Sequence, residues 1–312
     1  MTGTRLRAEY LAFGFIAVML LAGSLYSRNF LSTTYLLQQL EVASFLGVIA
    51  SGVMVVILLG HIDLSIPWTV TIGGMMSTAA AAWWSPALAL PFGVLCGLLV
   101  GLVNGIGVAY LRIPSMIFTL GINAVAQGLM VLHTGGFAPQ DAATPFMHWL
   151  AVEHTILGFP NALFVWVLVG GLVSLMLGRT ALGRYVYAIG NREAVAYLSG
   201  VDTRAVLIVS FAISGACSAL AGVLLAGYSN KAYQAMGDAY LLPAIAAVVL
   251  GGTNILGGRG TYLGTVAGVI LIGLLQSILS VMQMPEAGRQ VIYGLVIIVM
   301  LLVYGRGAKV HG

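Results

Sequence analysis

The fold of this chain is decided by the stretch RTALGRYVYAIGNREAVAYLSGVDTRA, residues 179–205, which interrupts an otherwise apolar sequence with polar and basic residues. It carries four of the eleven arginines and separates two apolar runs, each long enough to cross a bilayer as a helix. Lys and Arg are enriched on the cytoplasmic side of membrane proteins, so the arginines predict that this stretch is cytoplasmic. The side of this one stretch then sets the predicted topology of the whole chain.

The composition indicates an all-α integral membrane protein. Hydrophobic residues make up 60% and charged residues 7% of the 312 residues, whereas soluble domains are about 25% charged. The apolar runs are continuous rather than alternating, which favours helices over a closed barrel. We expect about ten transmembrane helices in a single transmembrane domain, residues 1–312. The ten runs are residues 9–27, 38–60, 66–84, 88–111, 114–134, 161–178, 206–227, 238–252, 262–283 and 288–304.

The distribution of charge supports this topology. With ten spans and both termini cytoplasmic, ten basic residues lie inside and three outside, as the positive-inside rule requires. The first run resembles a signal peptide, but no clear small-residue cleavage site follows it, so we expect an uncleaved span. The inner residues are Arg5, Arg7, Arg112, Arg179, Arg184, Arg192, Arg204, Arg259, Arg306 and Lys309, and the outer ones are Arg28, Lys231 and Arg289.

Several classes of function do not fit the sequence. The chain contains no phosphate-cradling nucleotide loop, no nucleophile–base pattern and no paired carboxylates, so we do not expect an enzyme. The five histidines have no metal-ligand spacing, and Cys96 and Cys217 fall inside spans as small apolar residues rather than as a disulfide. A net charge of +4 is too modest to indicate a nucleic-acid partner. We therefore predict the lipid bilayer as a partner, with no metal or cofactor held by this chain.

Two connections between the predicted spans are long. Residues 135–160 lie outside in this topology and could be a solvated cap or a docking surface for a soluble partner. Within 179–205, Asn191 suits an N-cap, Glu193 suits a first helical turn and Gly200 suits a C-terminal stop. The short helix between them carries Ala194, Val195 and Leu198 on one face, a shape that fits a groove in a partner.

Polar residues within the apolar runs are candidates for a solute pathway. Asp63, at the inner end of the second run, could line the pathway, or Asp63 or Ser65 could cap the next helix, with Pro67 in its first turn. The lack of further acids or histidines in the spans argues against a proton relay. Trp68 could stack on a sugar ring or belong to an interfacial aromatic belt.

A polar stripe also marks the fifth run. Thr119, Asn123 and Gln127 recur every four residues on one helix face. Such a stripe suits a neutral, hydroxyl-rich solute, or it could serve hydrogen bonds between helices. Asn104 and Gln276 present the same two alternatives.

The glycines predict two features, closely packed helix faces and an interruption of the helix in residues 242–265. Gly93, Gly97, Gly101 and Gly105, and likewise Gly260, Gly264 and Gly268, recur every four residues and predict smooth helix faces for close packing. In residues 242–265, two glycine pairs bracket Thr253 and Asn254, where the segment could be a hinge, a cavity wall or a tight cytoplasmic turn. The predicted topology favours the turn.

Three motifs together resemble one known family. GHIDLS at 60–65, TALGRYVYAIGNREAVAYLSGV at 180–201 and AIAAVVLGGTNILGGRGTYLGT at 244–265 look like the permease subunits of bacterial ABC-type monosaccharide importers, a family with ribose, xylose, rhamnose and autoinducer-2 permeases. The order and spacing match over nearly the whole chain. This chain departs from the family at His61 and Pro67, where the family usually has a small residue and a glycine.

The resemblance implies a function and a set of partners. It implies a multi-pass permease of the bacterial inner membrane that moves a monosaccharide or similar polyol inward by alternating access. The implied partners are a cytoplasmic ABC ATPase, which binds ATP and Mg, a periplasmic sugar-binding protein and a second permease copy, identical or not. The alternatives are a branched-chain amino-acid permease of the wider superfamily and a stand-alone carrier or channel. The residues that match the family's ATPase-coupling loop are Gly183, Arg184, Gly190, Asn191, Glu193, Ala194, Leu198 and Gly200.

Overall fold

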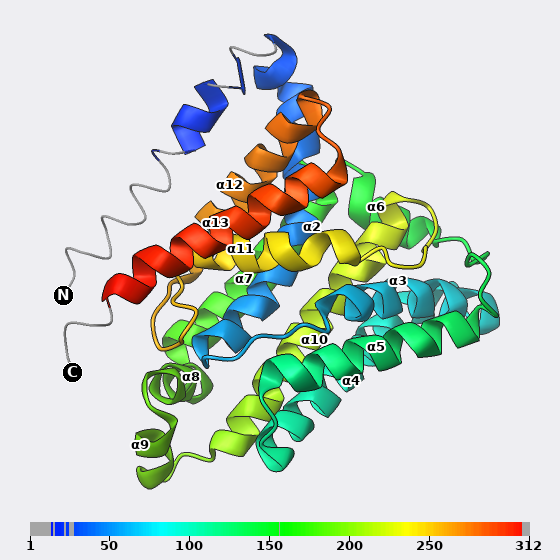
Figure 1. Cartoon of the computed structure of the whole chain (residues 1–312). Helices are drawn as coiled ribbons and strands as arrows, with labels where there is room; N and C mark the ends of the chain where they lie inside the picture. The colour runs from blue at the N-terminus through cyan, green and yellow to red at the C-terminus, as the bar shows by residue number, and fades with distance from the viewer. Residues whose placement is uncertain (1–13, 15, 22, 25–27, 156, 308–312) are drawn as a thin grey trace.

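The structure is a computed structural model that describes residues 14, 16–21, 23, 24, 28–155 and 157–307. Across these residues the chain is built from helices, and its extended pairing is one isolated bridge between Ala142 and Lys231 (Figure 1). Arg5, Arg7, Lys309 and most of the first predicted span, 9–27, lie outside the described residues.

The helices follow one another with short connections. In chain order they are η1 (Arg28–Leu31), α2 (Thr33–Leu58), α3 (Ile66–Trp83), η2 (Pro86–Leu88), α4 (Ala89–Leu111), α5 (Ser115–His133), α6 (Pro145–Val152), α7 (Asn161–Arg179), α8 (Ala181–Asn191), α9 (Glu193–Leu198), α10 (Thr203–Tyr228), η3 (Asp238–Tyr240), α11 (Leu241–Leu250), α12 (Tyr262–Val281) and α13 (Glu286–Gly307).

The predicted apolar runs from the second to the tenth each coincide with one of these helices. Six segments in the described part of the chain are long and apolar enough to cross a membrane. The chain is therefore an all-α, multi-pass membrane protein. The six are Thr33–Leu58, Pro86–Leu111, Ser115–His133, Asn161–Arg179, Thr203–Tyr228 and Tyr262–Val281.

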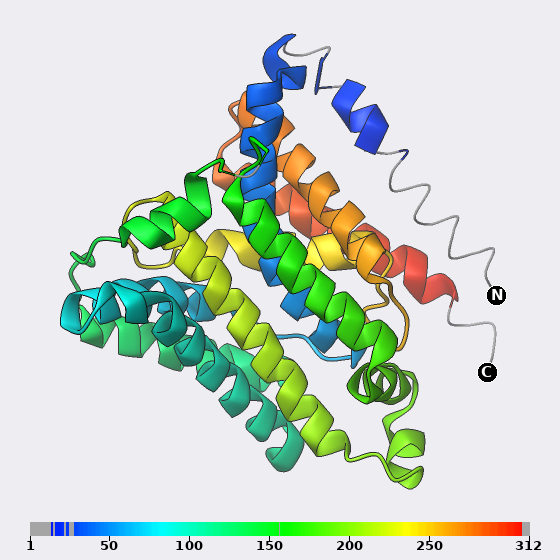
Figure 2. The same cartoon turned by 180° about the vertical axis from the view of Figure 1, so that it is seen from behind.

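Helix α10 lies at the centre of the bundle, with α2, α3 and α4 against it (Figure 2). The predicted glycine face of α4 packs on α10. A Cβ added at Gly101 would lie 2.9 Å from the Cα of Ala212, and one at Gly105 would lie 2.6 Å from the Cα of Ile208. The prediction of close helix packing is confirmed, because the absent side chains allow the two backbones to touch.

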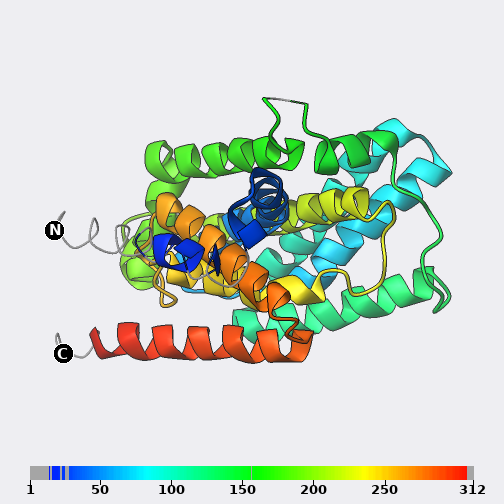
Figure 3. The same cartoon turned by 90° about the horizontal axis from the view of Figure 1, so that it is seen from above.

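The second glycine face has the same role between α11 and α12. A Cβ at Gly264 would meet the carbonyl oxygen of Gly251, and one at Gly268 would meet that of Ala247. Seen from above, α7 and α13 lie at opposite edges of the molecule, with α2 and α12 between them (Figure 3).

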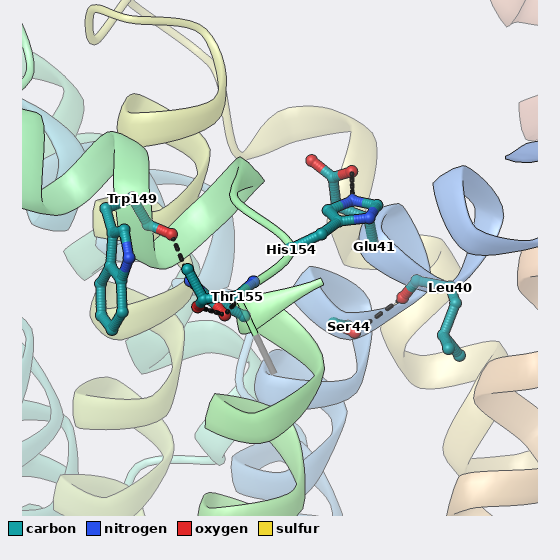
Figure 4. Close-up of polar contacts among 7 residues, drawn as sticks. Leu40, Glu41, Ser44, Trp149, His154 and Thr155 are labelled. Carbon is teal, nitrogen blue, oxygen red and sulfur yellow. Dashed lines mark hydrogen bonds and ion pairs between the residues drawn. The ribbon is translucent and has the colours of Figure 1, made fainter. Parts of the chain in front are cut away.

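The connection of residues 135–160, which we predict to be the outer connection, contains the short helix α6, which the sequence did not predict. Thr155 donates its hydroxyl to Oδ1 of Asn161 at 2.6 Å, and Asn161 donates its amide to the Trp149 carbonyl at 2.9 Å. Nε2 of His154 lies 3.8 Å from Oε2 of the buried Glu41 on α2 (Figure 4). These contacts tie the connection to the ends of α2, α6 and α7.

Candidate functional site

Two polar assemblies contain most of the predicted site residues, and the first is the basic stretch of 179–205. A sharp bend joins α7 to α8, where the Thr180 hydroxyl accepts the Gly183 N–H at 3.2 Å as an N-cap. Gly183 packs directly on the backbone of Met176 and Leu177, so a side chain there would clash. Arg184 follows on α8 and is exposed. The sequence predicted no helix at α8.

The short helix of the prediction exists as α9, but its N-cap was predicted wrongly. Asn191 ends α8, and its amide donates to the Tyr187 carbonyl at 2.9 Å. Arg192, with extended backbone, occupies the N-cap position instead, and Glu193 begins the helix. The physical reason is that an unpredicted helix, α8, extends through Asn191, so Asn191 is itself helical. Gly200 has φ +84° and closes the C-terminus as predicted.

Helix α9 presents apolar side chains that nothing in the described chain covers. Val195 is 55% exposed and Leu198 is 84% exposed, whereas Ala196 is buried against the rest of the molecule. Ala194 is exposed as well, as the predicted face requires, and it also lines a cavity behind the helix. A short helix with a free apolar face can dock in a groove of a partner.

Three backbone segments meet without intervening side chains at the end of α8. The Gly258 N–H donates to the Leu58 carbonyl at 2.9 Å. A Cβ at Gly190 would lie 2.5 Å from the nitrogen of Gly258 and would overlap the Leu58 oxygen. A Cβ at Gly257 would lie 2.7 Å from the nitrogen of Gly60. The glycine contact, residues 58–60, 190–191 and 257–258, therefore joins the end of α2, the end of α8 and the 251–260 turn rigidly.

The segment between α11 and α12 forms a closed turn. The Asn254 N–H donates to the Arg259 carbonyl at 2.8 Å, and Oδ1 of Asn254 accepts the Leu256 N–H at 3.1 Å. Thr253 is fully buried beside Gly260. Of the three alternatives raised by the sequence, this geometry is that of a turn.

The second assembly surrounds the connection between α2 and α3. Oδ1 of the buried Asp63 accepts the N–H and the hydroxyl of Ser65, at 2.9 and 2.6 Å, and Oδ2 accepts the hydroxyl of Ser214 on α10 at 3.2 Å. The Asn104 amide of α4 donates to the Ser65 hydroxyl at 2.7 Å. Ser65 occupies the N-cap position of α3, but its side chain bonds Asp63 instead of capping the helix.

The polar stripe of α5 bonds the backbone of the same connection. Thr119 accepts the Leu64 N–H at 2.9 Å, and Asn123 accepts the Trp68 N–H at 3.3 Å. Ser115, one turn before Thr119, accepts the Ile62 N–H at 3.3 Å. A backbone that leaves helical geometry within a bundle needs such acceptors, because lipid supplies none.

Not every predicted pathway residue joins this assembly. Gln127 continues the stripe but is exposed, and Trp68 is buried in α3 with its ring only 4% exposed. Gln276 lies half-buried on α12, outside the assembly. The sequence did not single out Ser115 or Ser214. The four-residue spacing from Thr119 could have found Ser115, but Ser214 has no local signal because its partner lies 151 residues away.

His61 connects the two assemblies. It lies in the α2–α3 connection and, with Glu193 of α9, lines the cavity behind that helix. Burial lowers the pKa of the His61 imidazole, and the Glu193 carboxylate opposes this effect in part.

The fold and these assemblies define a polytopic helical membrane protein with a non-helical connection between α2 and α3 and an exposed short helix, α9. Residues 35–301 match the family described as "Branched-chain amino acid transport system / permease component", and the chain belongs to that family.

Its relatives have more specific names. The ribose import permease protein RbsC of Haemophilus influenzae is 32% identical over 92% of this chain and 91% of its own length, and that of Bacillus subtilis is 32% identical over 91% and 89%. The autoinducer 2 import system permease protein LsrC of Escherichia coli is 32% identical over 89% of this chain and 81% of its own length. No solved structure matches the chain. The predicted family resemblance is confirmed.

Proposed function

We propose that this chain is the membrane subunit of an ATP-driven importer that moves a monosaccharide or similar polyol into the cytoplasm by alternating access. The observation that carries the proposal is helix α9, which exposes Val195 and Leu198 while the glycine contact joins its base to α2. Named relatives that import ribose and autoinducer 2 support the solute class.

The proposal includes the partners and the setting. A cytoplasmic ABC ATPase, which binds ATP and Mg, docks on α9, and a periplasmic sugar-binding protein delivers the solute to the outer face. Two permease copies, identical or not, surround the pathway in the bacterial inner membrane. Each copy has about ten spans and both termini in the cytoplasm, as the distribution of Lys and Arg favours.

Movement of α9 reaches the broken segment through the glycine contact. Residues 58–60 belong to this contact and directly precede the Asp63 assembly. Because closely packed backbones transmit displacement, a shift of α9 on ATP binding shifts the α2–α3 connection as well. The Asp63 carboxylate already accepts three hydrogen bonds from Ser65 and Ser214. This arrangement favours a structural role for Asp63 over pairing with the ammonium group of an amino acid.

The test uses the full chain with its partner ABC ATPase and sugar-binding protein. We expect Leu198→Arg and Glu193→Arg to abolish ATPase binding in a pull-down assay and ribose uptake in proteoliposomes. The matched control for ATPase binding is Leu157→Arg, since Leu157 is 88% exposed but lies in the connection predicted to be outside. If both α9 variants keep ATPase binding and uptake, the docking assignment is wrong. Uptake of leucine in place of any sugar, or uptake without ATP, would support one of the alternatives.

A further inference from the structure

A cavity of about 540 Å³ lies behind α9, between that helix, the end of α4 and the start of α10. The basic residues of its lining come from different elements. Arg112 comes from the end of α4, Arg204 from the first turn of α10 and His61 from the α2–α3 connection. Glu193 is the acidic residue among those that line it.

The two arginines have no carboxylate partner in the described part of the chain. Arg112 ends α4 in the left-handed conformation, with φ 52°. The guanidinium carbon of Arg204 lies 5.1 Å from the centre of the Tyr110 ring, a cation–π distance. In the described part of the chain, the ion pairs are those of His154 with Glu41 and of Arg289 with Glu286. Both guanidinium groups are therefore free to bind an anion.

An apolar surface adjoins the mouth of this cavity. Beside Arg112, the last residues of α4 and the first of α5 expose large apolar side chains. Tyr110 is 59% exposed, Leu111 is 63%, Met116 is 51% and Ile117 is 66%. In a membrane protein, such a surface at a helix end contacts lipid chains. A site with arginines in a hollow and apolar side chains at its rim matches a ligand that has both an anionic head and apolar tails.

We propose that this cavity binds the phosphate group of an anionic phospholipid of the cytoplasmic leaflet. Arginine binds phosphate oxygens through paired N–H donors, and basic hollows between membrane helices bind anionic headgroups. A soluble phosphate has the same anionic chemistry but gains nothing from the apolar rim. The bound lipid would contact the side of α9 that carries Glu193, Ala194 and Tyr197. The inference rests on the proposed topology, and it is independent of which solute is transported.

The test is a titration of the purified full chain in detergent, followed by native mass spectrometry. The probes are phosphatidylglycerol, phosphatidylcholine with the same acyl chains, and inorganic phosphate. We expect Arg112→Gln and Arg204→Gln each to weaken phosphatidylglycerol binding about fivefold, with little change for phosphatidylcholine. Arg112→Lys and Arg204→Lys keep the charge and should retain most of the binding. The matched control is Arg259→Gln, an exposed arginine of the 251–260 turn, outside the cavity.

Three results would overturn the proposal. The first is phosphatidylglycerol binding that is equal in the parent, Arg112→Gln and Arg204→Gln, or that falls as much in Arg259→Gln. The second is arginine-dependent binding of inorganic phosphate without arginine-dependent binding of the lipid, which would assign the site to a soluble phosphate. The third is loss of ATPase binding in the two glutamine variants with lipid binding intact, which would assign the cavity to an acidic segment of the ATPase. Failure of α9 to dock an ATPase at all would leave this site unaffected and would contradict the proposed function alone.

Discussion

Gly190 has the least room of the residues matched to the coupling loop. Its Cα faces the Leu58 carbonyl and the Gly258 nitrogen, so any side chain would separate α8 from α2 and from the 251–260 turn. We expect Gly190→Ala to cost about 1–3 kcal/mol of stability, the usual cost of forcing a methyl group into a packed site. Transport should fall further than stability alone explains, because the glycine contact links α9 to the α2–α3 connection. Thermal unfolding and proteoliposome uptake measure the two effects.

The control for this prediction is Gly178→Ala. Gly178 lies near the end of α7, and a Cβ there would meet nothing within 4 Å. Alanine is the better helix former, so this variant should be as stable as the parent or slightly more so. Equal behaviour of the two variants would show that the glycine contact is not tight.

Thr119 is the residue of the α5 stripe that the broken segment depends on most. Its hydroxyl accepts the Leu64 N–H at 2.9 Å in a buried position. Thr119→Val keeps the shape but removes the acceptor, and we expect a loss of about 1–3 kcal/mol because a backbone N–H remains unsatisfied. Gln127→Leu, on the same stripe but exposed, should change stability little. Detergent-solubilised thermal unfolding distinguishes them, and a similar loss in both variants would contradict the assignment.

The Asp63 assembly shows what the sequence can predict at this scale. The four-residue spacing correctly predicted that Thr119 and Asn123 share one helix face. Hydrogen bonding between helices was one of the two roles predicted for them. It could not show that their partners are backbone groups of residues 64 and 68, since those contacts span 55 residues. Ser214 was missed for the same reason, because hydroxyls on apolar helices are common and only the fold brings this one to Asp63.

At the scale of elements, the α2–α3 connection should be sensitive to acid through His61. Burial lowers the folded-state pKa of His61 below its ordinary value of 6.5, with Glu193 opposing this effect and Arg112 and Arg204 lining the same cavity. Between the folded-state pKa and pH 6.5, the imidazole of His61 therefore binds a proton in the unfolded chain but not in the folded chain. Stability conferred by neutral His61 is present above that pH and is lost as pH falls toward the folded-state pKa.

The measurement compares thermal unfolding of the parent and His61→Gln as pH falls through this range. We expect the variant to lose less stability than the parent, because glutamine does not titrate. Glu193→Gln removes the carboxylate that favours protonated His61. The stability of this variant should therefore depend on acid more strongly than that of the parent. An identical pH dependence in the parent and His61→Gln would show that His61 does not control the stability of this connection.

Helices α8 and α9 show why short elements are harder to predict than long ones. Glu193 and Gly200 correctly indicated a short helix in the polar stretch, whereas Asn191 proved to be the last residue of α8. No local signal predicts α8, because α8 is held by tertiary contact with the 251–260 turn. A cap residue can serve either the end of one helix or the start of the next, and packing decides between them.

At the scale of the whole molecule, hydrophobic length predicted nearly every long helix. The runs at α3, α11 and α13 are not among the six candidate spans, and the surroundings of α3 and the length of α11 explain the first two. Helix α3 contains Thr69, Thr71, Ser77 and Thr78, which are buried against protein rather than exposed to lipid, and α11 has only ten residues. A hydropathy count does not distinguish a helix that faces lipid from one that is enclosed by its neighbours, because both need apolar surfaces.

The topology remains a prediction, and two exposed leucines are suited to test it. Leu157 in the outer connection is 88% exposed and Leu198 on α9 is 84% exposed, so a cysteine at either position is equally open to reagent. We expect a membrane-impermeant maleimide to label Leu157→Cys in intact cells and Leu198→Cys only after the membrane is opened. The parent, with Cys96 half-buried and Cys217 buried, supplies the baseline.

The same reagent can locate the C-terminus through a cysteine added after Gly312. With an even number of spans between residue 198 and the C-terminus, that cysteine and Leu198→Cys must be labelled together, on the side opposite Leu157→Cys. Labelling of Leu157→Cys and Leu198→Cys from the same side would place both long connections on one face, and it would exclude ATPase docking on α9 together with delivery of solute to the 135–160 connection. Labelling of the C-terminal cysteine from outside would instead require an odd number of spans between residue 198 and the C-terminus. In that case either one of the helices predicted to cross after α9 does not cross the membrane, or an additional helix does.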